Sequence, residues 1–154
     1  MDNTYLAYIA GFLDGEGCIT MVKVYRKDPR NKNPRYKEEF WGNVSVGMAD
    51  PEPQRILLKQ LRDDFGGYYA EFKSRGGINT RDTIFWRLTS TKASEFLKLI
   101  LPYLRIKQRQ AQIVVRYHEL LKNNRGKKKD PPQKELDERV ELIKEIRQLN
   151  KRGK

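Results

Sequence analysis

The sequence predicts one α+β domain in which helices cover one side of a four-stranded sheet. The 154 residues are enough for a single domain with its own core. The apolar periodicity gives the order helix, strand, strand, helix, strand, strand, helix, followed by more helices. Helices segregated to one side of a sheet leave its other face uncovered.

The first half of the chain supplies a helix and two strands. Asn3 and Thr4 are good helix caps, and an apolar helix is predicted from Tyr5 to Leu13, stopped by the glycines of DGEG. Strands are predicted at Cys18 to Tyr25 and at Phe40 to Met48, with a polar, basic, proline-containing loop between them.

The next elements repeat this order. Apolar residues at helical spacing predict a helix from Gln54 to Phe65, begun by two prolines. Strands are predicted at Tyr68 to Arg75 and at Thr83 to Ser90, and helices at Ala93 to Leu104 and at Ile106 to Lys122.

The chain divides into a domain core over residues 1–122, a basic linker over 123–132 and a last helix over 133–150. An apolar stripe on that helix predicts packing on the outer helices of the domain. The stripe consists of Leu136, Val140, Ile143, Ile146 and Leu149.

Charge and composition point to a polyanionic partner. Lys and Arg number 32 against 20 Asp and Glu, a net charge of +12, which creates a field suited to nucleic acid. A merely soluble basic protein is the alternative. One cysteine excludes an internal disulfide, and no signal peptide or membrane-spanning run is recognisable. We therefore expect an intracellular protein.

The uncovered sheet face is expected to carry polar, charged and aromatic side chains. Because side chains alternate along a strand, a core set of Ile84, Trp86 and Leu88 turns Arg87 to the open side. A solvated face is the alternative interpretation. The basic and aromatic residues instead favour nucleic-acid contact, since a curved sheet ribbon can enter the major groove.

The stretch YIAGFLDGEGCI, Tyr8 to Ile19, places two acids at the end of a helix. The dipole at a helix C-terminus is already negative, so an anion there costs roughly 0.3 to 1 kcal/mol. Small residues recur on one face of the same helix at Ala7, Gly11 and Gly15, which allows a second backbone to approach closely.

IAGFLDGEG, Ile9 to Gly17, resembles the nine-residue signature of the LAGLIDADG homing endonucleases. Glu16 replaces the usual second Asp, and the residues in register are Ala10, Gly11, Asp14 and Gly17. The segment from Leu101 to Leu121, which contains KQRQ, resembles the family's late basic segment. The resemblance implies the αββαββα fold, with a curved antiparallel sheet that forms a DNA-binding saddle.

The resemblance also implies an activity. A single-motif member is a homodimeric, site-specific endonuclease that cuts both strands of a long pseudo-palindromic DNA site of about two helical turns, in the context of intron homing. The implied cofactor is Mg²⁺ or Mn²⁺, with Ca²⁺ able to occupy the site without supporting cleavage. Hard divalent ions accept oxygen ligands of the kind that the motif offers.

Roles follow by position within the resemblance. Glu16 and the main-chain carbonyl of Gly15 match the metal ligands, and Lys107 matches a lysine beside the scissile phosphate. Gln54 and Asp50 fall where the family carries polar residues that order water. Residues expected at the dimer interface are Ala7, Ala10, Gly11 and Asp14, with Asp14 orienting or capping the motif rather than binding metal.

Direct readout of DNA is expected on the sheet, from Thr20, Val22, Val24, Arg26, Trp41, Asn43, Ser45, Gly47, Glu71, Lys73, Arg75 and Arg87. Lys23 falls on the face expected to be buried, which a β-bulge would repair. Contacts to phosphates or outer base pairs are expected from Arg30, Lys32, Arg35, Lys37, Lys107, Arg109, Lys127 and Lys128.

The main rival hypothesis is a non-cleaving nucleic-acid binder on the same fold, such as an intron RNA maturase or a transcription regulator. Glu16 argues against it, because a pure binder has no reason to keep an acid where phosphates approach. A general basic scaffold protein leaves the motif unexplained.

Overall fold

The computed structural model describes residues 2–26, 37–49, 52–74, 81–124 and 131–151. The elements are α1 (Asn3–Glu16), β1 (Gly17–Arg26), β2 (Lys37–Ala49), α2 (Glu52–Phe65), β3 (Tyr68–Phe72), β4 (Thr83–Thr89), α3 (Ser90–Ile100), α4 (Gln108–Asn124) and α5 (Gln133–Leu149). The predicted fold class and element order are confirmed.

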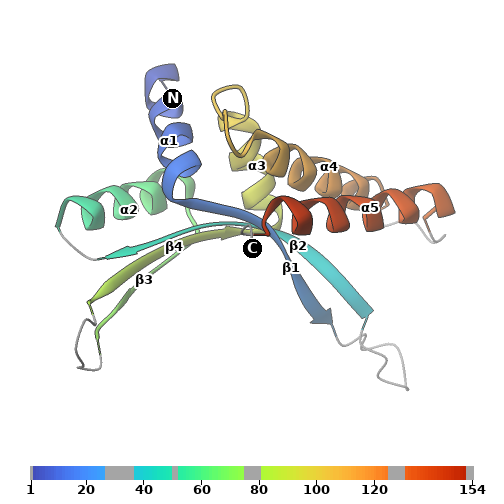
Figure 1. Cartoon of the computed structure of the whole chain (residues 1–154), viewed down its shortest axis with the longest axis horizontal. Coiled ribbons are helices and arrows are strands. Elements are labelled where there is room, and N and C mark those ends of the chain that lie inside the picture. Colours follow the sequence, from blue (N-terminus) through green and yellow to red (C-terminus); the bar gives the residue numbers. More distant parts are fainter. Residues whose placement is uncertain (1, 27–36, 50–51, 75–80, 125–130, 152–154) are drawn as a thin grey trace.

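The four strands form one antiparallel sheet in the order β1-β2-β4-β3. Figure 1 shows that this sheet arches, with the helices on its convex side and the concave face left uncovered. The C-terminal end of α1 leads directly into the edge strand β1, so the acidic motif lies at the level of the sheet.

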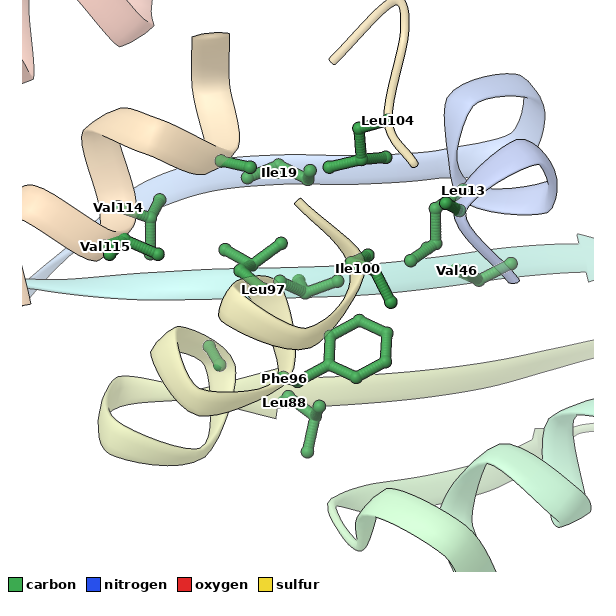
Figure 2. Close-up of a cluster of buried hydrophobic side chains, with 14 of the residues drawn as sticks. Leu13, Ile19, Val46, Leu88, Phe96, Leu97, Ile100, Leu104, Val114 and Val115 are labelled. Carbon is green, nitrogen blue, oxygen red and sulfur yellow. The ribbon is translucent and has the colours of Figure 1, made fainter. Parts of the chain in front are cut away.

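The core lies between the convex face of the sheet and the helices. Phe96, Leu97 and Ile100 of α3 lie over strands β2 and β4, where they meet Val46 and Leu88 (Figure 2). These side chains are almost fully buried, and burying each one fully is worth about 1.5 to 3 kcal/mol. Helix α3 is therefore the centre of the hydrophobic layer.

Helix α4 approaches the sheet closely at a glycine. A Cβ atom at Gly42 of β2 would lie 2.3 Å from Cγ1 of Val114 on α4, so only glycine leaves room there. The segment just before α4, residues 105–107, lies against the end of α1 and is hydrogen-bonded to it.

Two helix boundaries differ from the prediction. Helix α1 continues through the glycines to Glu16, and its N-cap is Asp2 rather than Asn3 or Thr4. The last turn persists because the carbonyls of Leu13 and Asp14 accept hydrogen bonds from the Lys107 ammonium. Such bonds satisfy carbonyls that a helix end leaves without partners.

Three further helix and strand boundaries also differ from the prediction. Helix α3 ends at Ile100, two residues before Pro102, and α4 begins at Gln108 rather than at residue 106. The backbone N–H groups of residues 105–107 donate to Asp14 instead of joining a helix. Strand β3 ends at Phe72, earlier than predicted.

Helix α5 packs on α4 and β1, which only partly confirms the predicted stripe. Ile143 and Ile146 are buried. The end of the helix is tied to the sheet, because the Asn150 side-chain amide donates to the Ile19 carbonyl at 2.9 Å. The remaining members of the stripe are exposed, namely Leu136, Val140 and Leu149.

Within the residues that the structure describes, no helix has the length and apolar character needed to cross a membrane.

Candidate active site and nucleic-acid interface

The carboxylate of Asp14 binds the backbone that precedes α4. Its Oδ2 accepts hydrogen bonds from the backbone N–H of Arg105 at 2.7 Å and of Ile106 at 3.1 Å. Its Oδ1 accepts from the backbone N–H of Lys107 at 2.8 Å. Asp14 is 8% exposed, so this carboxylate is a buried structural clamp, as its predicted capping role requires.

Lys107 completes the clamp from the other side. Its ammonium donates to the Leu13 carbonyl at 2.9 Å and to the Asp14 carbonyl. A cation at the C-terminal end of a helix is favourable, because it opposes the negative end of the helix dipole. Asp14 and Lys107 therefore fix each other, and the ammonium lies against the residues that immediately precede Gly15 and Glu16.

The electrostatics of Asp14 reflect these contacts. Burial raises the pKa of Asp14, but the three backbone N–H donors, helped by the charge of Lys107, outweigh it. The pKa of Asp14 is therefore lowered from its ordinary value. The carboxylate is ionised at neutral pH and supplies fixed negative charge at the helix end.

This lowered pKa predicts how acid affects stability. Because the folded pKa lies below the unfolded value of about 3.9, ionised Asp14 stabilises the fold above that pH. This stabilisation is lost as the pH falls through the folded pKa. We expect the free energy of unfolding to fall more for the wild type than for Asp14→Asn between about pH 5 and about pH 2. Urea unfolding across this pH range measures the free energy of unfolding of both proteins. Parallel pH profiles for the two would contradict the prediction.

Glu16 differs from Asp14 in being exposed at the last position of α1. Among the described residues, none forms an ion pair or hydrogen bond with its carboxylate. Gly15 beside it is also exposed, and a Cβ there would meet nothing within 4 Å. The end of α1 thus presents oxygen atoms that could ligate a metal, close to the fixed ammonium of Lys107.

These donors suit a hard divalent cation, which prefers carboxylate and carbonyl oxygens. Among the described residues, no group of three or more His, Cys, Asp or Glu side chains could hold a metal ion. The described part of the chain thus provides part of a coordination sphere, and Mg²⁺ or Ca²⁺ needs six or more oxygens. Glu16 and Gly15 fit such an ion if further ligands come from a second molecule or from a nucleic acid.

The exposed face of α1 carries small residues that the chain's own packing does not require. Ala7 and Gly11 are exposed, and a Cβ at Gly11 would meet nothing within 4 Å. Two of the residues expected at the dimer interface are instead buried inside the chain. Ala10 is fully buried in the core and Asp14 is turned to the segment before α4, which corrects the prediction for both.

The predicted water-ordering residues are not brought to the acidic helix end by any described contact. Gln54 lies in the first turn of α2, which packs on β3 and β4. Its side-chain oxygen is buried without a hydrogen-bond partner among the described residues. Asp50 lies outside the described residues.

On β1 and β2 the predicted reading face is confirmed as the open side of the sheet. Ile19 and Val44 are paired and buried on the helix side, so their neighbours turn to the concave face. The concave side then carries Cys18, Thr20, Val22, Val24, Trp41, Asn43, Ser45 and Gly47. The ladder runs without interruption from Gly17 to Arg26, so Lys23 lies on the helix side, exposed, without the bulge.

On β3 the predicted reading face is wrong. Glu71 pairs with Ile84, and Tyr69 with Trp86, so both belong to the helix side. Glu71 accepts a hydrogen bond from the Tyr69 hydroxyl at 2.8 Å and lies 3.3 Å from Lys59. Lys73 follows the end of the strand.

The concave face of the β3–β4 half of the sheet instead carries Tyr68, Ala70, Phe72, Thr83, Phe85, Arg87 and Thr89. The alternation of YYAEF alone does not separate the two faces. The cross-strand pairing with Trp86 does, because residues directly opposite in an antiparallel pair share a face.

Several predicted phosphate contacts fall elsewhere. Arg109 is exposed and forms a bidentate ion pair with Glu145 of α5, at 2.6 and 2.8 Å, so in the single chain its charge is paired with that carboxylate. Arg26 and Lys37 form the last described backbone pair of the β1–β2 ladder. The predicted contacts Arg30, Lys32, Arg35, Arg75, Lys127 and Lys128 lie outside the described residues.

Comparison with known proteins gives relatives of one kind. No protein-family model matches the chain. DNA endonuclease I-CreI of Chlamydomonas reinhardtii is 29% identical over 118 residues, which are 76% of this chain and 64% of that protein. DNA endonuclease I-CvuI of Chlorella vulgaris is 27% identical over 130 residues, 84% of this chain and 71% of that protein. The chain thus spans less than two thirds of the first of these relatives.

Three solved structures with a similar fold are complexes with DNA. The homing endonuclease I-CvuI with its target has a TM-score of 0.69 at 23% identity, covering 98% of this chain and 85% of that one. The archaeal intron-encoded homing endonuclease I-Vdi141I complexed with DNA has a TM-score of 0.67 at 18% identity, covering 100% and 89%. The LAGLIDADG homing endonuclease I-GzeII with its DNA target has a TM-score of 0.60 at 13% identity, covering 90% and 43%.

Proposed function

We propose that this chain, a homologue of I-CreI and I-CvuI with the fold of the LAGLIDADG homing endonucleases, is a site-specific, divalent-metal-dependent DNA endonuclease. The reaction is hydrolysis of phosphodiester bonds in both strands of a long duplex site. The protein acts as a homodimer on a pseudo-palindromic sequence.

One observation carries the proposal. At the end of α1 the structure separates two acids that lie two residues apart, because Asp14 is buried in a clamp while Glu16 is exposed. The helix dipole disfavours an anion at the C-terminal end of a helix. A cation that binds there explains why α1 keeps a free carboxylate at that end. This end of α1 lies at the level of the sheet, where the edge strand β1 begins.

The residues of this end have distinct roles. Glu16 and the carbonyl of Gly15 hold the divalent ion, preferably Mg²⁺ or Mn²⁺. When bound, such an ion supplies Lewis acidity and a hydroxide nucleophile near neutral pH. Lys107, fixed by the carbonyls of Leu13 and Asp14, provides positive charge where negative charge develops on the phosphate.

A second copy of the chain completes the site. Ala7 and Gly11 leave one face of α1 open to close approach by another helix. Two copies related by a two-fold axis bring two Glu16 carboxylates together, and the symmetry of the dimer implies a symmetric DNA site. The net charge of +12 provides the attraction to the DNA backbone.

The test is selection of cleaved sites from a random duplex library. We expect one family of roughly palindromic sites to be cut in Mg²⁺ and none in EDTA. Sequence-specific binding without any metal-dependent cut would favour the non-cleaving binder instead. If no sequence is bound or cut, the proposed function is wrong.

A further inference from the structure

We propose that the β3–β4 half of the concave face recognises the 5-methyl groups of thymines in the target, and this inference rests on the proposed function. The surface concerned, here the aromatic patch, consists of Tyr68, Ala70, Phe72 and Phe85. In this proposal, the β3–β4 half of the sheet reads the major groove through apolar contacts.

The patch is continuous across two strands. On the concave face Ala70 lies opposite Phe85, and Phe72 lies opposite Thr83. Tyr68 is 54% exposed and Phe72 is 53% exposed. The ring of Phe85 lies over Gly47 of β2, because a Cβ there would be 3.3 Å from its Cδ2. Gly47, one of the predicted reading residues, is exposed and lies directly beside this ring.

One charged group lies inside the patch. The Arg87 guanidinium carbon is 5.8 Å from the ring centre of Tyr68 and 5.8 Å from that of Phe85. Rings that contact a guanidinium restrict its orientation and favour its charge through cation–π attraction. The patch therefore presents one oriented arginine surrounded by apolar surface.

The β1–β2 half adds hydrogen-bonding groups to this surface. Thr20 and Asn43 face each other across that ladder, and the Asn43 amide lies 3.4 Å from the Ser45 hydroxyl. Asn43 is buried, which leaves Thr20 and Ser45 as the groups able to bond a ligand. Apolar side chains also lie on this half of the concave face, namely Val22, Val24 and Trp41.

Duplex DNA is the ligand that these observations favour for the aromatic patch. The patch is continuous with the β1–β2 part of the concave face through the pairing of β2 with β4, and the chain carries a net charge of +12. In the major groove the apolar group is the thymine methyl, which contacts side chains such as phenylalanine. Exposed aromatic rings on a DNA-reading surface therefore select thymine.

The experiment uses a cleaved site from the library and removes methyl groups without changing base pairing. Each thymine is replaced by deoxyuridine, singly and together, and the dissociation constant of the wild-type protein is measured in Ca²⁺. We expect the affinity to fall about fourfold for each methyl group that contacts the patch. Equal affinity for the thymine and uracil duplexes at every position would overturn the inference.

Two variants assign the effect to the patch. Phe85→Ser removes the apolar contact and is expected to abolish the preference for thymine over uracil at specific positions. Phe85→Leu keeps an apolar side chain and is expected to preserve that preference. If both variants keep the wild-type ratio at all positions, Phe85 does not carry the readout and its assignment is overturned.

Failure of this inference is distinguishable from failure of the proposed function. A protein that cuts a specific site in Mg²⁺ but ignores the methyl groups retains the function and overturns the inference. A protein that binds no DNA sequence overturns both. An apolar patch used instead for a protein partner would show as methyl-independent DNA binding, which also counts against the inference.

Discussion

Replacing Glu16 with glutamine is expected to lower the rate of metal-dependent DNA cleavage by at least about 10²- to 10³-fold while DNA binding is kept. Glutamine has the same shape but lacks the charge that holds a divalent ion. Glu16 is exposed, and within the described part of the chain no residue depends on its carboxylate. The substitution should therefore leave the fold intact. Single-turnover cleavage and equilibrium binding to the selected site measure the two effects separately.

Glu16→Asp is the matched control for this result. It keeps the carboxylate and restores the residue that is usual in the family signature, so substantial cleavage should remain. Cleavage by Glu16→Gln at the wild-type rate would show that the exposed acid is not a metal ligand.

Replacing Gly11 with leucine is expected to weaken assembly and lower cleavage without harming the fold of the single chain. A Cβ at Gly11 meets nothing within 4 Å in the chain, and leucine is a better helix former than glycine by roughly 0.5 to 1 kcal/mol. Between two closely packed helices the same side chain clashes, at about 1 to 3 kcal/mol for each copy. The dimerisation constant should weaken by roughly 30- to 10⁴-fold.

Thermal unfolding and sedimentation distinguish these two consequences. Gln112→Leu, at an exposed position of α4, serves as the control and should leave assembly and cleavage unchanged. Gly11→Leu that assembles and cuts like the wild type would contradict the proposed contact between two α1 helices.

Much of the fold was predictable because its signals are local. Apolar periodicity predicts the helices. The alternation of Ile84, Trp86 and Leu88 predicts strand β4, and all three residues are buried. The prediction turns the wrong side of strand β3 to the open face, because Tyr69 and Glu71 are polar residues of a kind common on surfaces. Their true neighbours, Lys59 and Trp86, lie on other elements.

The candidate site was predictable only in part. The motif located Asp14 and Glu16 and assigned them different roles, but it did not predict that one is buried and the other exposed. The burial of Asp14 depends on backbone donors more than 90 residues away in the chain. The hydrogen bonds of Asp14 with residues 105–107 require the segment before α4 to lie against the end of α1, which are distant parts of the chain. Likewise, the pairing of Arg109 with Glu145 depends on where α5 docks.

In the proposed dimer, two chains meet through the exposed faces of their α1 helices when they act on DNA. Disulfide cross-linking of Gly11→Cys tests it most directly, with the exposed Cys18 replaced by serine and with Asn123→Cys, at an exposed position of α4, as the control. We expect rapid formation of a covalent dimer, with twice the 18.2 kDa mass of one chain, in the presence of the cleaved site. Cross-linking no faster than that of the control, by protein that still cuts DNA, would contradict it.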